Sequence, residues 1–254
     1  MKRLFTLLAV LFPLVAAASA TAATPSLDGW WPLYEGSGTV AHDASGHHND
    51  GTVSGTSPWS AGYFGSALSA DGSTTRVDVR DSPSLEPASA VSVTAWVRAS
   101  GPEGQFQYII AKGASSCMAA SYGLYTASDG GLAFYVSQND GFTFTASPDP
   151  GSGLWDGKWH FVVGTYDGSA VRLYVDGAQV GTGTPASGAI GYGLTSGNDL
   201  FIGHYDGCPA HDFVGTIDEP TVWTGALNAS QVSIAYRVMA GLHGWVSRLP
   251  SFPS

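Results

Sequence analysis

Apolar and polar residues alternate along residues 157–182, which read GKWHFVVGTYDGSAVRLYVDGAQVGT. A period of two places successive side chains on opposite faces of a β-strand. Asp-Gly pairs at 167–168 and 176–177 supply the positive φ angles of tight hairpin turns, so we expect these aspartates to serve turn geometry rather than chemistry. The stretch predicts three antiparallel strands, at about 159–166, 170–176 and 178–182.

The same pattern recurs along most of the chain. Nine Asp-Gly dipeptides occur, the first at Asp28 and the last at Asp206. Between such turn signals lie further short strand patterns, at 91–98, 107–112, 122–126, 132–136, 200–203 and 214–223. Many short strands with regular turns predict an all-β fold, a two-sheet antiparallel jelly-roll sandwich.

The pattern becomes helical only near the end, over residues 227–241. Asn228 and Gln231 have the spacing of a capping box, and Gly241 is a typical residue at a helix C-terminus. We therefore expect one short C-terminal helix, with Gly241 as its end and residues 241–254 as a tail.

The first 20 residues have the features of a secretory signal peptide. Lys2 and Arg3 precede an apolar run, and Ala18-Ser-Ala20 fits a cleavage site, although cleavage after Ala23 also fits. An uncleaved anchor is the alternative, but the apolar run is short for a membrane span. We expect a secreted, extracellular protein without membrane insertion after cleavage, and a monomer.

Charge and cysteine content fit this location. The net charge of −10 becomes −12 when Lys2 and Arg3 are removed, because eight basic residues then face 20 acidic ones. An acidic chain without a basic patch argues against nucleic acid as a partner. In an oxidising compartment Cys117 and Cys208 are expected to form a disulfide, with two separate buried thiols as the alternative.

Several phrases occur in an order that resembles a known family. They are WPLYEGSG (31–38), DASG (43–46), DGTV (50–53), FGSAL (64–68), VTAWV (93–97), GKWH (157–160), YDG (166–168), LYVDG (173–177) and VGTIDE (214–219). Over residues 27–240 the chain resembles a laminin-G-like domain of the concanavalin A-like lectin/glucanase superfamily, in its secreted bacterial form. The resemblance implies a jelly roll, a fold that carries lectins, adhesion modules and glycosidases.

The resemblance also implies a structural Ca²⁺, held between an N-terminal loop and the last strand. Asp43 and Asn49 match the loop, and Asp218 matches the last-strand motif. These oxygen ligands suit Ca²⁺, but an Asx-type turn explains the loop as well.

Two loops are candidates for a sugar-binding surface, since lectin sites combine aromatic rings with carboxylates and amides. The first, residues 204–212, contains Tyr205, Asp206, His211 and Asp212, and the second, residues 135–144, contains Gln138 and Asn139. The alternative is that Tyr205 packs on the sheet edge. Four tryptophans within strand motifs are expected in the core: Trp31, Trp96, Trp159 and Trp223.

Catalysis has weaker support. Asp218 and Glu219 are adjacent and should point to opposite faces of a strand, so they do not form the carboxylate pair of a glycosidase. Three functions stay open: non-catalytic binding of a polysaccharide or glycoconjugate with a structural Ca²⁺, binding of an extracellular protein by an adhesion module, and glycoside hydrolysis or lysis. We expect the first.

Overall fold

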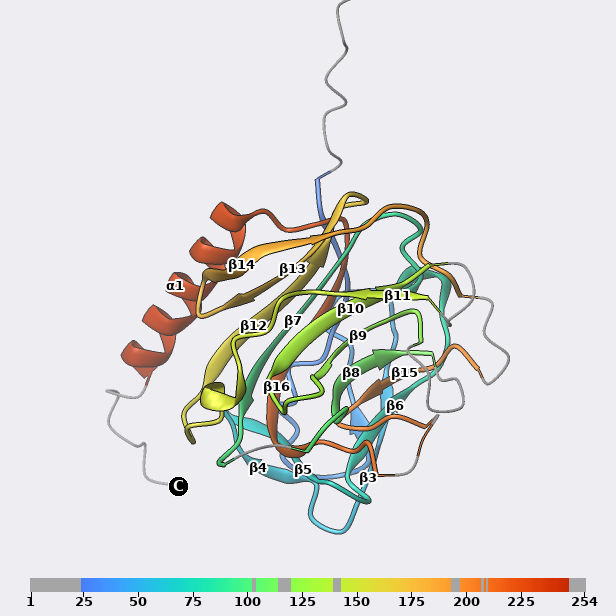
Figure 1. The fold of residues 1–254 in the computed structure, drawn as a ribbon. Helices are drawn as coiled ribbons and strands as arrows, with labels where there is room; N and C mark the ends of the chain where they lie inside the picture. The colour runs from blue at the N-terminus through green and yellow to red at the C-terminus, as the bar shows by residue number, and fades with distance from the viewer. Residues whose placement is uncertain are drawn as a thin grey trace, which may run out of the picture.

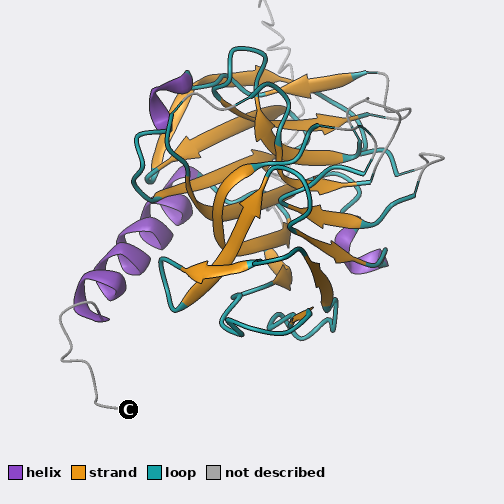
Figure 2. Ribbon diagram, turned by 90° about the horizontal axis from the view of Figure 1, so that it is seen from below, coloured by secondary structure: helices purple, strands orange, loops and turns teal. Residues whose placement is uncertain are grey.

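The computed structural model describes residues 24–101, 104–113, 120–138, 143–192, 197–206, 208 and 210–246. Within these ranges, none of the helices is both long and apolar enough to cross a membrane. The strands form two antiparallel sheets that face each other, and the C-terminal helix lies outside them (Figures 1 and 2).

The first sheet, sheet A, carries the helix on its outer face. Its strands run in the order β14-β13-β12-β7-β16-β5-β4, and β1 also pairs with β16. They are β1 (Ser26–Trp30), β4 (Trp59–Ala61), β5 (Ser66–Asp71), β7 (Val91–Arg98), β12 (His160–Tyr166), β13 (Ala170–Val175), β14 (Ala178–Pro185) and β16 (Val214–Thr224).

The second sheet, sheet B, has the order β11-β10-β9-β8-β15-β6-β3-β2. Its strands are β2 (Val40–Ala41), β3 (Gly51–Ser54), β6 (Arg76–Val79), β8 (Tyr108–Lys112), β9 (Tyr122–Thr126), β10 (Leu132–Ser137), β11 (Phe144–Ala146) and β15 (Leu200–Ile202). Two 3₁₀ turns, η1 (Pro83–Leu85) and η2 (Ser152–Leu154), lie in the connections.

Alternation along the strands explains how the sandwich is filled. On β12, Val162 points into the main core between the sheets, while Phe161 and Val163 point out and pack under the helix. The turn between β13 and β14 has positive φ at both Asp176 (51°) and Gly177 (81°), as a type I′ hairpin requires. The predicted jelly-roll sandwich is therefore confirmed, and with it the turn role of Asp176.

The helix α1 (Ala229–Val246) begins as predicted but ends later than predicted. Asn228 Oδ1 accepts from the backbone N–H of Gln231 at 3.0 Å, and Gln231 Oε1 accepts from that of Asn228 at 2.9 Å, so the capping box forms. Gly241 was expected to end the helix, but the helix continues for another turn. There the His243 ring stacks on Tyr63 with centroids 4.0 Å apart, a tertiary contact that offsets the low helix propensity of glycine.

The tryptophans divide into two groups. Trp31 and Trp96 are buried, as expected. Trp159 and Trp223 are only half-buried, and the core prediction is wrong for them. Trp159 lies just before β12, beside Tyr63 and under the Arg98 guanidinium, and Trp223 faces the outside of sheet A, where it borders α1.

Candidate functional site

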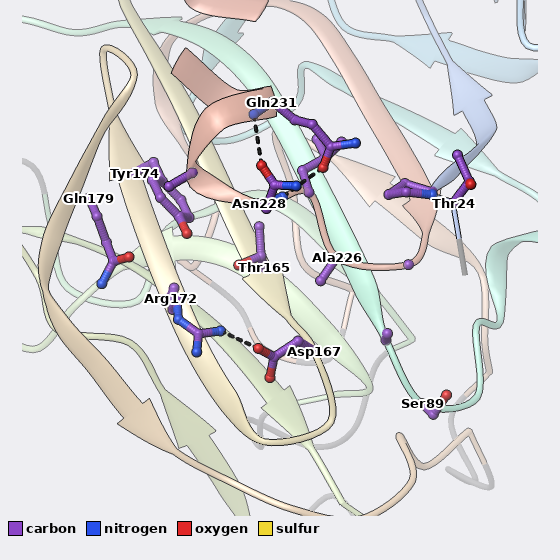
Figure 3. Close-up of a pocket in the computed structure, with 15 residues that line it drawn as sticks. Thr24, Ser89, Thr165, Asp167, Arg172, Tyr174, Gln179, Ala226, Asn228 and Gln231 are labelled. Atoms are coloured by element: carbon purple, nitrogen blue, oxygen red, sulfur yellow. Dashed lines mark hydrogen bonds and ion pairs between the residues drawn. The ribbon is translucent and has the colours of Figure 1, made fainter. Parts of the chain in front are cut away.

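A large hollow lies on the outer face of sheet A, beside the N-terminus of α1 (Figure 3). It is an open groove of about 750 Å³. Strands β12, β13 and β14 form one wall, and the segment from Gly225 to Gln231 forms the other. The groove thus joins parts of the chain that lie some fifty residues apart in the sequence.

Charged and hydroxyl side chains from the strands point into this groove (Figure 3). Arg172 Nη1 donates to Asp167 Oδ2 at 2.6 Å. Partial burial acts to raise the pKa of Asp167, but hydrogen bonds from Ser169 and Arg172 outweigh it and hold the pKa at about 2. Asp167 is therefore ionised at neutral pH, and since Asp167 is the one hydrogen-bond partner that Arg172 has among the described residues, the other N–H groups of Arg172 can donate to a ligand.

Two carboxamides complete the opposite wall. In the capping box, Asn228 and Gln231 use their side-chain oxygens as acceptors. Among the described residues neither side-chain nitrogen has a hydrogen-bond partner, so both can donate into the groove. Gln179 adds a third carboxamide on β14.

Planar polar side chains of this kind suit a polyhydroxylated ligand. Guanidinium, carboxylate and carboxamide groups can each pair with neighbouring hydroxyls, and the buried Tyr174 and Thr165 add hydroxyl groups to the floor. The sequence did not point to this groove, because Asp167 and Asn228 already had structural roles in a turn and a cap. The polar outward positions of β12 and β13, Thr165 and Arg172, were the available signal.

The predicted sugar-binding loop 204–212 lies instead on the outer face of sheet B. Tyr205 is buried, with 1% of its surface exposed, and stacks on Tyr108 at a centroid distance of 4.2 Å. Tyr205 therefore packs on the sheet, which was the alternative to a sugar-binding role, and its ring has no open face for a sugar. His204 Nδ1 contacts Asp212 Oδ1 at 2.5 Å, which makes Asp212 a partner within the loop.

Two other residues of this loop are more accessible. Asp206 lines a smaller hollow of about 310 Å³, together with Arg76, Asp78 and Asp199. His211 lies near the Tyr108 ring, and burial lowers its pKa, an effect that Asp212 only partly offsets. Of the four predicted residues of this loop, Asp206 is the one that lines this smaller hollow.

The remaining predicted residues are placed in part. Gln138 is half-buried and its backbone N–H donates to the Thr143 carbonyl at 3.2 Å. Asn139 and Cys117 lie outside the described residues. The Cys117–Cys208 disulfide and a ligand role for Asn139 therefore stay predictions.

The contacts of Asp43 test whether its loop fits a Ca²⁺ ion. Its Oδ1 accepts from the backbone N–H groups of Trp30 (3.0 Å) and Ser45 (2.8 Å), and its Oδ2 accepts from Ser45 Oγ and Asn49 N (2.9 Å each). These four donors occupy the four lone-pair positions of the carboxylate. Asp43 therefore holds the loop as an Asx-type turn, the alternative to a Ca²⁺ site. The side-chain nitrogen of Asn49 donates to the Asp28 carbonyl and to Ser84 Oγ, and its Oδ1, the atom that could bind Ca²⁺, lies 3.4 Å from Ser84 Oγ.

Asp218 has a separate environment. It is fully buried, Oδ2 accepts from Phe64 N at 2.9 Å, and Oδ1 accepts from Glu219 N at 3.0 Å. Burial raises its pKa to about 7. No cluster of three or more His, Cys, Asp or Glu side chains that could hold a metal ion occurs in the described part of the chain. The four donors to the Asp43 carboxylate do not favour Ca²⁺ at this residue, while the Ca²⁺ site of Asp43, Asn49 and Asp218 stays a prediction that calorimetry with Ca²⁺ would test.

Comparison with known proteins now adds to the geometry. The family described as "Concanavalin A-like lectin/glucanases superfamily" matches residues 71–233. The chain belongs to this superfamily. No curated protein matches this laminin-G-like domain at a significant level.

Solved structures with the same jelly-roll fold include binding domains of larger proteins. Domain 4 of AbnA, a GH43 extracellular arabinanase from Geobacillus stearothermophilus solved with arabinotriose, has a TM-score of 0.63 and 18% identity, over 83% of this chain and 98% of that one. The botulinum neurotoxin serotype G binding domain has a TM-score of 0.64 and 14% identity, over 85% of this chain and 51% of that one.

A third structure was solved with a glycan. The botulinum neurotoxin DC binding domain in complex with SialylT has a TM-score of 0.59 and 14% identity, over 84% of this chain and 52% of that one. The laminin-G-like domain thus spans about half the length of these toxin domains. At such low identities the likeness concerns the fold.

Proposed function

We propose that this protein is a secreted, non-catalytic carbohydrate-binding domain that holds a polysaccharide or glycoconjugate in the groove beside α1. One observation supports this proposal above others. The groove is lined by an Arg–Asp ion pair, by three carboxamides and by four hydroxyl groups, those of Thr24, Ser89, Thr165 and Tyr174. This lining matches the alternating donors and acceptors of sugar hydroxyls.

The chemistry of the groove favours binding over hydrolysis. Glycosidases of the usual kind place two carboxyl groups on either side of the scissile bond. Asp167 is the one carboxylate among the residues that line the groove, and its low pKa and ion pair with Arg172 make it a poor proton donor. Jelly-roll neighbours solved with arabinotriose and with SialylT show that this fold can carry glycan binding.

The test is a polysaccharide and glycan array with the mature protein and two matched variants. Arg172→Gln removes the cation of the groove, whereas Arg76→Gln removes the corresponding cation of the small hollow near Asp206. Each arginine pairs with one aspartate, at 2.6 Å to Asp167 and 3.1 Å to Asp78. The expected result is selective glycan binding that Arg172→Gln weakens at least tenfold and Arg76→Gln leaves unchanged, since lost hydrogen bonds to a charged group weaken binding by roughly this factor.

Two results would contradict the proposal. Binding that Arg76→Gln abolishes and Arg172→Gln preserves would move the site to the 204–212 loop of sheet B. No glycan binding, together with capture of an extracellular protein that free sugar does not displace, would favour the adhesion module.

A further inference from the structure

A second hollow lies on sheet A next to the groove, and we call it the apolar pocket. It has a volume of about 300 Å³ and is formed by residues of β1, β7, β12, β16 and α1. Its walls are mainly carbon, from Leu27, Phe161, Val163, Val232 and Met239. Leu227 lines both the groove and the apolar pocket, so the two hollows meet at this residue.

The segment that carries Leu227 is fixed in place between the two hollows. The backbone N–H of Leu227 donates to Ser92 Oγ on β7 at 2.8 Å, and Ser92 Oγ donates to the Gly225 carbonyl at 2.9 Å. The Gly225 N–H donates to the Ala90 carbonyl at 2.9 Å. Leu227 is half-buried, so part of its side chain stays exposed where the groove and the apolar pocket meet.

The polar groups at the apolar pocket are already paired with one another. Glu219 accepts from Trp30 Nε1 at 2.6 Å and from Tyr34 Oη at 2.5 Å. The hydroxyls of Thr94 and Thr221 lie 2.7 Å apart, and the latter also accepts from the Trp223 indole N–H at 2.8 Å.

Such internal pairing leaves mostly carbon facing the apolar pocket. A polar ligand would have to break these bonds, whereas an apolar group would only displace water from carbon. The half-buried Trp30 and Trp223 rings add flat apolar walls that an alkyl chain or an aromatic ring can contact.

We infer that the protein binds an amphiphilic glycoconjugate, with its glycan in the groove and its apolar aglycone, an alkyl or aryl group, across Leu227 in the apolar pocket. This inference rests on the proposed function, since the groove must hold the sugar. It adds a ligand class that the groove alone does not define, because a simple polysaccharide would leave the apolar pocket empty.

The experiment is calorimetric titration of the mature protein with methyl, propyl and hexyl β-D-glucopyranosides and β-D-galactopyranosides, and with hexan-1-ol. Each methylene that enters the pocket should tighten binding about fourfold. Ala235→Leu should remove this gain, because Ala235 lines the apolar pocket and the added carbons fill it. Ala240→Leu, the same change on the same helix at a half-buried position outside the lining, should keep it.

A measurement on the wild-type protein covers the case in which Ala235→Leu disturbs the helix. Intermolecular NOEs from the hexyl chain to the Trp30 and Trp223 rings are expected, while NOEs from the sugar ring are expected at Tyr174. Hexyl NOEs to other parts of the surface would overturn the inference.

The outcomes separate the inference from the function on which it rests. If methyl glycosides bind in an Arg172-dependent way and hexyl glycosides bind no tighter, the inference fails and the carbohydrate-binding function stands. If hexan-1-ol binds as well as hexyl glycosides and Arg172→Gln has no effect, the sugar does not contribute to binding, and both the inference and the proposed function fail. If no alkyl glycoside binds while the array identifies a polysaccharide, the inference alone fails.

Discussion

A lysine inside the sandwich allows a quantitative test of how the connections are held. The Lys112 side chain is completely buried at the end of β8. Its Nζ lies 2.5 Å from Asp81 Oδ1 and 3.4 Å from Glu86 Oε1, donates to the Asn198 carbonyl, and sits 5.9 Å from the Tyr192 ring centroid. One ammonium therefore fixes the segment around η1 and the loop before β15.

We predict that Lys112→Met lowers the free energy of unfolding by about 3 kcal/mol. Methionine keeps most of the volume, so the loss comes from the carboxylates and the carbonyl that lose their partner. The value lies at the low end for a broken buried ion pair, because Asp81 and Glu86 are 43% and 26% exposed and water can reach them. For a domain of this size the melting temperature should fall by about 6–12 °C.

Urea unfolding followed by tryptophan fluorescence measures the loss, and Lys158→Met is the matched control. Lys158 pairs with Asp156 at 2.6 Å, nearly the same distance, but its side chain is 78% exposed. An exposed pair contributes little, so this variant should unfold like the wild type. If both variants lose the same stability, or neither does, burial does not decide the strength of these ion pairs and the reasoning is refuted.

Three further variants test other parts of the structure. His160 contacts Asp176 at 2.8 Å and Asp156 at 3.1 Å, and the bond to Asp176 raises the pKa of His160 above 6.5 despite burial. The stabilising contribution of His160 should therefore be complete below about pH 6.5 and disappear as the pH rises through the raised pKa. His160→Gln should flatten this part of a plot of urea midpoint against pH, and an unchanged plot would contradict the assignment. Gly164→Ala should cost about 1–3 kcal/mol in the same unfolding assay, because a Cβ there would overlap the Phe134 ring across the sandwich; a neutral result would mean that the sheets can separate. Asn228→Ala should cost about 1 kcal/mol through loss of the cap, and helix content measured by circular dichroism should fall with it.

The fold could be predicted from the sequence because local signals and tertiary packing agree in it. The strands at 91–98 and 122–126 match the structure residue for residue, since alternation and turn residues both define them. The helix end was missed because the stacking of His243 on Tyr63 joins residues 180 positions apart, and no local pattern shows such a contact.

The candidate site was harder to predict for a related physical reason. Tyr205 is a residue type that often stacks on sugars, but its exposure depends on Tyr108, which is its neighbour only in the folded chain. The sequence assigns Arg172 no role and Gln231 only a role in the helix cap, and their place in the site comes from the way β13 and α1 face each other across the groove.

The place of β16 in sheet A has a consequence for the order of folding. This strand comes after 213 residues of chain, yet it pairs with β1, β5 and β7 and so forms the middle of the sheet. Before Val214 emerges during synthesis, β5 and β7 have no common neighbour, and sheet A is divided into β14-β13-β12-β7, β5-β4 and the unpaired β1. The long-range pairings of β16 with β1, β5 and β7 therefore form late, and we expect closure of the sandwich to be a slow step. Until β16 is present the sandwich stays open, the state in which a polypeptide can still be threaded through a narrow channel.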